Sequence, residues 1–194
     1  MKAPVFFYDF SSPYSYLSAH RVDELLPVAP RWQPIMFGAL IRAIDKLPWS
    51  MREGTARDAR MRECEQRAAA LGLPLRWPPG WPTETYSVLV LRAALVAEEL
   101  GLLREFSRAA YRQGLGLGRD LTDLDVVLEA AEEVGIEGTA LRDGVERPEI
   151  KERLRGVTDE ARELGVTGIP TIYTGEQLYW GDDRLADAAA ALAA

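Results

Sequence analysis

Apolar residues of the β-forming kind are grouped near the two ends of the chain, and helical patterns fill the long stretch between them. Residues 5–10, VFFYDF, predict a buried first strand. Ser12 followed by Pro13 predicts the start of a helix that continues to about Leu26. The expected strands are residues 5–10, 31–37, 170–173 and 177–180, and the expected closing helix is 183–193. The chain therefore opens as βαβ and closes as ββα, which predicts an α/β fold.

The stretch from 48 to 156 carries helical patterns and no convincing strand. The helices expected within it and at its end are residues 61–71, 86–103, 104–112, 123–134 and 148–164. Thr122 is expected to be the N-cap of the 123–134 helix. The simplest organisation is a discontinuous α/β domain, residues 1–47 and 157–194, that carries an inserted α-helical domain at 48–156.

Composition and charge argue against several classes of function, among them nucleic-acid binding and a membrane-spanning protein. Of the 194 residues, 47% are apolar, which is enough for a solid core, and the net charge of −7 argues against a nucleic-acid partner. No stretch resembles a membrane span, and the first residues lack the pattern of a secretory signal. The single cysteine, Cys64, permits no internal disulfide, so we expect a cytoplasmic protein. With one histidine besides, a His/Cys metal site is not expected, and neither is any other metal.

Three short motifs make the fold class specific. They are DFSSPYSYL at residues 9–17, GVTGIPT at 165–171 and WGDDRL at 180–185. The order βαβ…ββα, with an X-Pro step entering the third strand, resembles the thioredoxin fold with a helical insertion. Ser12 and Ser15 stand where disulfide oxidoreductases of the Dsb type carry a Cys-x-x-Cys pair. With serine in the first place, the chain resembles the 2-hydroxychromene-2-carboxylate isomerases and the kappa-class glutathione transferases.

The resemblance implies a glutathione-dependent isomerase that acts on a conjugated aromatic acid through a thiolate adduct. In that family pattern Ser12 holds the glutathione thiolate, and the backbone of Ile169, beside a cis Pro170, holds the cysteinyl part. The γ-glutamyl end is expected at Asp182, Asp183 and Arg184. The resemblance also implies a homodimer with a small-molecule aromatic substrate.

The physical chemistry of a helix start agrees with this role for Ser12. A free thiol has a pKa near ~8.5, and lowering it by ~2 units requires ~2.7 kcal/mol. A helix N-terminus contributes ~0.3–2 kcal/mol to an anion, and a hydroxyl bond to a charged acceptor ~1.5–3 kcal/mol. The chain's only histidine, His20, lies two helical turns away and is expected to be structural. Ser12 is therefore interpreted as a thiolate stabiliser and not as a nucleophile.

Other interpretations of the same residues stay open. Ser12 with Pro13 can be only an N-cap and a first-turn proline, Pro170 an ordinary strand-edge proline, and Asp183 only a helix cap. The runner-up activity is a kappa-type glutathione transferase, which makes the same thiolate but releases a conjugate. From a different class, the chain can be a non-catalytic thioredoxin-fold module that binds a thiol or a peptide.

The insertion departs from the isomerase pattern where the second substrate is expected. The relatives' Lys-x-x-Tyr is missing from residues 54–59, GTARDA, where Arg57 is the candidate replacement for the lysine, and Glu84 stands in place of an asparagine. The aromatic loop at 77–82 is either plain packing or a lid over an apolar substrate, with Trp81 as a candidate contact. The glycine-rich stretch at 114–118 is expected to be a loop, and Cys64, between two glutamates, an inert thiol.

Overall fold

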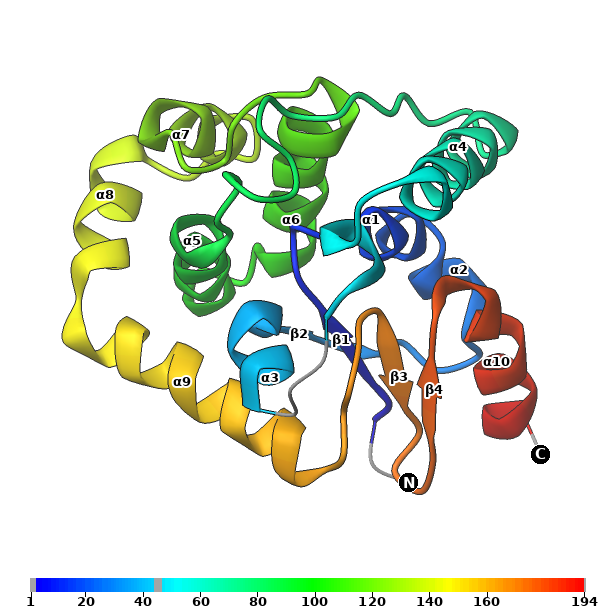
Figure 1. Cartoon of the computed structure of the whole chain (residues 1–194). Helices are drawn as coiled ribbons and strands as arrows, with labels where there is room; N and C mark the ends of the chain where they lie inside the picture. Colours follow the sequence, from blue (N-terminus) through cyan, green and yellow to red (C-terminus); the bar gives the residue numbers. More distant parts are fainter. Residues whose placement is uncertain (1–2, 44–46, 194) are drawn as a thin grey trace.

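The computed structural model describes residues 3–43 and 47–193, and within them four strands form one mixed sheet (Figure 1). The strands are β1 (Val5–Tyr8), β2 (Arg31–Pro34), β3 (Thr171–Tyr173) and β4 (Leu178–Trp180), in the spatial order β2-β1-β3-β4. β2 runs parallel to β1, whereas β3 is antiparallel to both β1 and β4. The βαβ and ββα units expected from the sequence are therefore confirmed, and the fold is thioredoxin-like.

The register of the sheet brings three turns to one end of it. Phe7 is paired with Thr171, and Thr171 is paired with Trp180. Consequently, three segments meet at this end of the sheet: the one that leaves β1, the one that enters β3 and the one that leaves β4. These segments contain the three motifs singled out in the sequence, of which the first ends at residue 17 and the other two begin at residues 165 and 180.

The helices of the α/β part differ in detail from the expected ones. They are α1 (Pro13–Ala19), α2 (Val22–Leu25), α3 (Phe37–Ala43), the short 3-10 helix η3 (Asp182–Arg184) and α10 (Leu185–Ala193). The single helix expected up to Leu26 is interrupted at Arg21, whose backbone is not helical (φ −125°) and whose guanidinium turns to Asp182. The strand expected to reach residue 37 ends at Pro34, and Phe37 instead begins α3 with its N–H bonded to the Asp9 carboxylate.

Within the described residues, the block between the two halves contains helices and loops and no strand, as expected. It consists of η1 (Trp49–Met51), α4 (Thr55–Ala70), α5 (Val88–Glu99), α6 (Leu103–Tyr111), the π-helical η2 (Arg112–Gly116), α7 (Leu124–Glu132), α8 (Gly138–Glu146) and α9 (Pro148–Glu163). Several details differ from the expected ones. α4 begins six residues earlier than expected, α8 had no expected counterpart, and η2 replaces most of the expected glycine-rich loop. The N-cap of α7 is Asp123 and not Thr122, because the Asp123 side chain accepts the N–H of Asp125.

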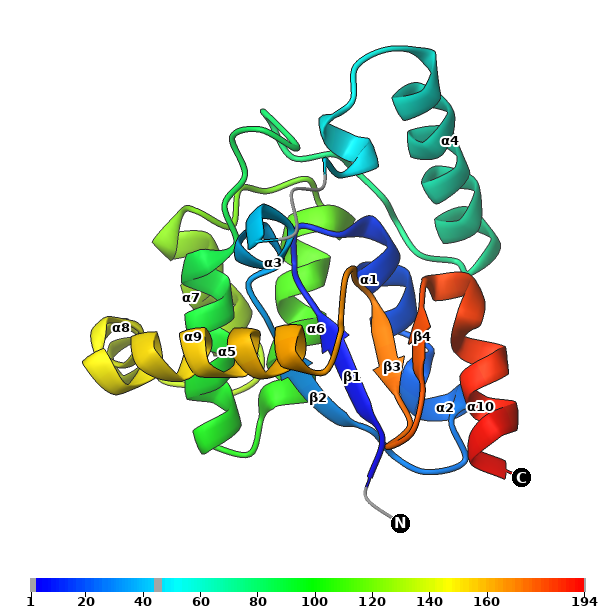
Figure 2. The same ribbon diagram turned by 60° about the horizontal axis from the view of Figure 1, so that its bottom comes forward.

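One large hydrophobic cluster joins the sheet to this block. Phe6, Tyr8 and Trp32 from the strands pack in the same cluster as Leu95 of α5 and Phe106 of α6. Figure 2 shows α5 to α8 gathered beyond β2, α9 crossing from α8 toward β1, α10 beyond β4 and α4 beside α1. The division into two domains stays a prediction, and α9 runs without interruption across its expected boundary at 156/157. Within the two described ranges, no helix combines the length and the apolar character needed to cross a membrane.

Candidate functional site

Ser12 caps the N-terminus of α1, as the sequence predicted. Its backbone is extended (φ −98°, ψ 119°), its Oγ accepts the N–H of Ser15 at 3.2 Å, and Pro13 occupies the first helical position. A hydroxyl offers one proton and two acceptor sites. Because the bond to Ser15 uses only an acceptor site, the half-buried hydroxyl keeps its proton for a group outside the helix. An anion placed there would also face the positive end of the helix.

The turn that carries Ser12 is held in place by hydrogen bonds to the fully buried side chain of Asp9. The Asp9 Oδ1 accepts the N–H of Ser11, and its Oδ2 accepts the N–H of Phe37, both at 2.9 Å. Burial raises the pKa of Asp9, while hydrogen bonds from Ser11, Ser87 and Phe37 act in the opposite direction. This acid received no role in the sequence-based prediction.

The segment before β3 has the geometry expected of it. The Ile169–Pro170 peptide bond is cis, as predicted. The Pro170 carbonyl accepts the N–H of Gly181 at 2.9 Å, and the Thr171 hydroxyl donates to the Gly168 carbonyl at 2.8 Å, so both sides of the turn are fixed. Among the described residues, no partner bonds the backbone N–H or carbonyl of Ile169. These two groups are therefore available to an extended ligand.

Asp182, the first residue of η3, is buried and already has several partners. Its Oδ1 accepts from the Ser18 hydroxyl at 2.8 Å and from Arg21 at 2.5 Å, and its Oδ2 pairs with Arg67 of α4 at 3.3 Å. This carboxylate thereby joins α1, α4 and the segment after β4. The two arginines lie 161 and 115 residues from Asp182 in sequence, which is why the sequence did not reveal them as its partners.

The other two residues expected at the γ-glutamyl end lie at the surface. Asp183 and Arg184 are exposed, and Arg184 forms an ion pair with Asp187 one turn later. The structure thus brings Asp182, Asp183 and Arg184 to the sheet edge where the Ser12 and Pro170 turns also lie. Their assignment to a ligand stays a prediction.

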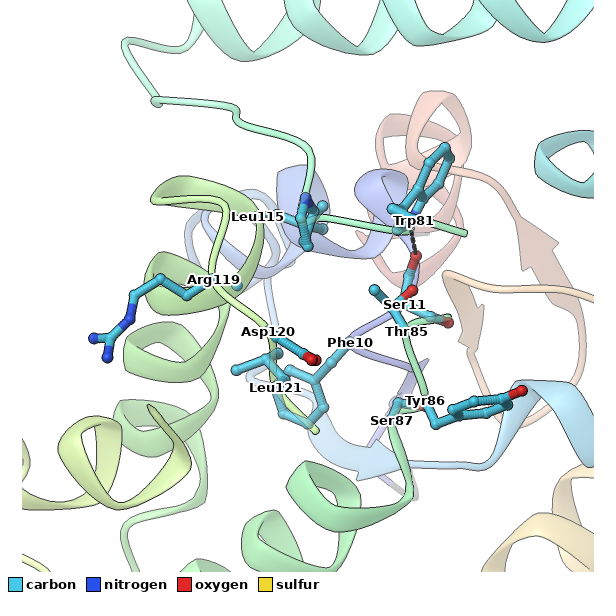
Figure 3. A pocket seen from close by; sticks show the side chains of 12 residues that line it. Phe10, Ser11, Trp81, Thr85, Tyr86, Ser87, Leu115, Arg119, Asp120 and Leu121 are labelled. Atoms are coloured by element: carbon cyan, nitrogen blue, oxygen red, sulfur yellow. Dashed lines mark hydrogen bonds between the residues drawn. The ribbon is translucent and has the colours of Figure 1, made fainter. Parts of the chain in front are cut away.

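A small, largely apolar pocket, half open to solvent, adjoins the Ser12 turn (Figure 3). The Trp81 indole lies over its edge and donates to the Ser11 carbonyl at 3.2 Å. Trp81 also packs against Trp77 and Trp49, with ring centroids 4.4 and 5.8 Å away. The side chains that give the pocket its character are Phe10, Trp81, Thr85, Tyr86, Ser87, Leu115 and Leu121.

The arginine side chains near this pocket do not point into it. Arg119 contributes to the lining, but its guanidinium points away and pairs with Glu129 (Figure 3). Arg57, the sequence-based candidate for a substrate carboxylate, lies near the start of α4 and is 3.9 Å from Asp58. Within the part of the chain that the structure describes, Arg57 is not among the residues lining the pocket. The contacts that the pocket offers to a ligand are therefore mainly apolar, and no arginine side chain points into it from the described residues.

A family model described as the DSBA-like thioredoxin domain matches residues 5–193. The chain belongs to this family. It is 29% identical over 184 residues to the 2-hydroxychromene-2-carboxylate isomerase of Sphingobium xenophagum, in an alignment that covers 93% of this chain and 92% of that protein. It is 27% identical to the isomerase of the same name from Pseudomonas sp. (strain C18), with 93% and 85% covered. The resemblance stated from the motifs is thereby confirmed.

Solved structures agree on the fold of this DSBA-like protein. A structure of 2-hydroxychromene-2-carboxylate isomerase superposes with a TM-score of 0.84 at 20% identity, covering 98% of this chain and 94% of the other. The cytosolic disulfide reductase DsbM from Pseudomonas aeruginosa, in a structure with GSH, superposes with a TM-score of 0.65 at 19% identity, with 98% and 97% covered. At these identities the likeness shows a common fold.

Two residues of this DSBA-like chain, Cys64 and His20, have reactive side chains that take no part in the proposed site. Cys64 is fully buried in α4, and burial raises its pKa to about 12, with the Glu63 charge acting in the same direction. His20 is at the opposite end of α1 from Ser12, against the Tyr16 ring, and burial lowers its pKa. The Cys64 thiol therefore stays protonated, and His20 stands at the wrong end of α1 to activate Ser12.

Proposed function

We propose that this DSBA-like protein is a glutathione-dependent isomerase that acts on a conjugated aromatic acid through a reversible thiolate adduct. The observation that carries the proposal is the Ser12 hydroxyl, which keeps its proton free at a helix N-terminus beside an apolar pocket. The names of the relatives support an isomerase. The proposal includes a cytoplasmic homodimer, the form that the sequence resemblance implies.

The residues at this edge of the sheet fit a glutathione molecule. When bound, glutathione would supply a thiolate that adds to a conjugated double bond and later leaves it. The Ser12 hydroxyl would donate to that sulfur, and the free N–H and carbonyl of Ile169, beside Pro170, would hold the cysteinyl backbone as an added strand does. Asp182, Asp183 and Arg184 are the candidates for the γ-glutamyl end, which carries both an amine and a carboxylate.

The chain has a serine where a disulfide oxidoreductase needs its first cysteine, and this difference decides between two chemistries. Disulfide exchange requires an attacking protein thiolate and a second thiol. Ser12 and Ser15 supply neither, and Cys64 is buried with a raised pKa. A hydroxyl that donates to a sulfur belonging to the ligand fits the Ser12 geometry instead.

The pocket supports the aromatic part of the proposed substrate. Trp81 offers an aromatic ring at the pocket edge, and Phe10, Leu115 and Leu121 contribute to its apolar lining. Trp81 would cover the substrate while its indole N–H stays on the Ser11 carbonyl. For the carboxylate of the substrate, Arg57 stays the candidate that the sequence offers: it does not line the pocket, but among the described residues its one ion pair, with Asp58, is long at 3.9 Å.

The experiment uses the purified full chain with a hydroxychromene-carboxylate and a catalytic amount of glutathione. An isomerase converts the substrate with no change in mass and leaves the glutathione unconsumed. Stoichiometric loss of glutathione with a thioether product would show the kappa-type transferase instead. Glutathione binding without turnover of either kind would show the non-catalytic module, and the same assay without glutathione is the control for thiol dependence.

A further inference from the structure

Asp9 lies directly after β1 and has no solvent contact that would explain a charged side chain there, since it is only 1% exposed. Both of its carboxyl oxygens accept backbone N–H groups, from Ser11 and from Phe37, at 2.9 Å each. The Asp9 carboxyl therefore links the turn before α1 to the start of α3. A carboxylate accepts one N–H group on each of its two oxygens, whereas an asparagine in the same place has one acceptor oxygen and an amide nitrogen that only donates.

The backbone of the same turn is held by further contacts. The Asp9 carbonyl accepts the N–H of Ser12 at 3.2 Å and the hydroxyl of Tyr111 at 3.1 Å. The Ser11 carbonyl accepts from Trp81. The peptide groups that lead into Ser12 are thus fixed both from the core, through Asp9 and Tyr111, and from the aromatic loop.

Asp9 also connects the turn to the pocket wall. The Ser87 hydroxyl is a hydrogen-bond partner of Asp9, and Ser87 precedes α5 and lines the pocket together with Ser11. A single buried carboxyl therefore contacts the turn of Ser12, the start of α3 and the pocket wall at the start of α5.

We propose that Asp9 is a positioning residue, whose carboxyl sets where the Ser12 hydroxyl stands relative to a substrate in the pocket. Asp9 acts through the Ser11–Ser12 turn and does not touch the reacting atoms. The inference rests on the proposed function, because it assigns the alignment between the thiol site and the pocket to one residue. Small displacements of a reacting group from its productive position cost up to ~100-fold in rate, so alignment of this kind has a measurable effect.

The test is the Asp9→Asn variant, alone and combined with Ser12→Ala. Asparagine has the same shape, but its amide nitrogen cannot accept an N–H, so the bond to either Ser11 or Phe37 is lost. We expect kcat to fall about tenfold or more with KM within about twofold. In the Ser12→Ala background the same substitution should lower kcat by less than about twofold, because the group that it positions is already absent.

Asp23 provides a matched control. It is a second carboxylate with several partners, Trp32, Arg104 and Arg108, but it lies at α2, away from the pocket. Asp23→Asn should lower the melting temperature and leave kcat within about twofold in both backgrounds. Equal loss of kcat from Asp9→Asn with and without Ser12 would show a purely structural acid and overturn the inference, as would an unchanged kcat.

A readout without catalysis separates this inference from the proposed function. The amide N–H of Ser15 donates to the Ser12 Oγ, so its proton and nitrogen shifts report where that hydroxyl stands. Asp9→Asn should move the Ser15 amide resonance, and Asp23→Asn should not. Asp9→Glu, which keeps both acceptor oxygens but displaces them, should also move the Ser15 resonance and serves if Asp9→Asn does not fold. A stationary Ser15 resonance overturns the positioning role, whereas lack of turnover by the unchanged protein overturns the proposed function.

Discussion

Replacing Ser12 by alanine separates its two roles, because one hydroxyl both caps α1 and, in the proposed function, donates to a thiolate. The cap is a single hydrogen bond from the Ser15 N–H. Its loss should cost about 1 kcal/mol of unfolding free energy, or roughly 2–4 °C in melting temperature for a chain of this size. The bond to a charged sulfur is worth ~1.5–3 kcal/mol, so its loss should raise the pKa of bound glutathione by about 1–2 units.

The assay is an ultraviolet titration of the bound thiolate in the unchanged and variant proteins. If the bound thiol has a pKa near ~6.5, about three quarters of it is ionised at pH 7, and the variant should retain only about 3–24%. Asp123→Ala is the matched control, since Asp123 caps α7 through the N–H of Asp125 and, among the described residues, is not one that lines the pocket. It should lower the melting temperature by a similar amount without moving the thiol pKa. A thiol pKa that is the same in Ser12→Ala would refute the thiolate role and leave Ser12 as a cap.

Three further substitutions test neighbouring parts of the site. Cys64→Ala should leave turnover within about twofold, because the reacting sulfur belongs to glutathione and burial keeps the Cys64 thiol protonated; loss of turnover would instead indicate a protein nucleophile. Trp81→Phe keeps an aromatic ring but removes the N–H bonded to the Ser11 carbonyl, so KM for the aromatic substrate should rise by about threefold or more; steady-state kinetics that do not change would argue against the lid. Gly168→Ala places a Cβ 2.2 Å from the Trp180 indole and should destabilise the fold by ~1–3 kcal/mol in a denaturant titration; the double variant with Trp180→Ala should recover most of that loss, and no recovery would mean that the clash is elsewhere.

The parts of the fold that the sequence predicted correctly are those with strong local signals. Ser12 and Pro13 mark the start of α1 by side-chain and ring chemistry that acts within one turn. Pro148 begins α9 in the same way, and the run of β-forming residues at 5–8 forms β1. Each of these signals depends on a few neighbouring residues, so one sequence was enough.

The parts that failed depend on contacts between distant segments. α8 contains Gly144, which lowers its helical propensity, but a Cβ there would lie 2.8 Å from Val96, so the glycine permits close packing on α5. Gly114 looked like a loop residue for the same reason, although it allows η2 to pack against Leu121. A glycine required by packing and a glycine required by a turn are identical in sequence, and only the structure distinguishes them.

Asp182 shows how a residue can be found by sequence while its environment is missed. Its carboxylate has about four acceptor positions, and Ser18, Arg21 and Arg67 use three of them. Arg67 is also paired with Glu63, so the two arginines and two acids of this cluster balance in charge. An incoming γ-glutamyl amine would therefore find one acceptor position on Asp182 and no excess negative charge there. The neighbouring Asp183 is exposed, and its carboxylate is not bonded to Ser18, Arg21 or Arg67, so Asp183 is the stronger candidate for the amine. Asp182 would then act mainly to hold α1, α4 and η3 together.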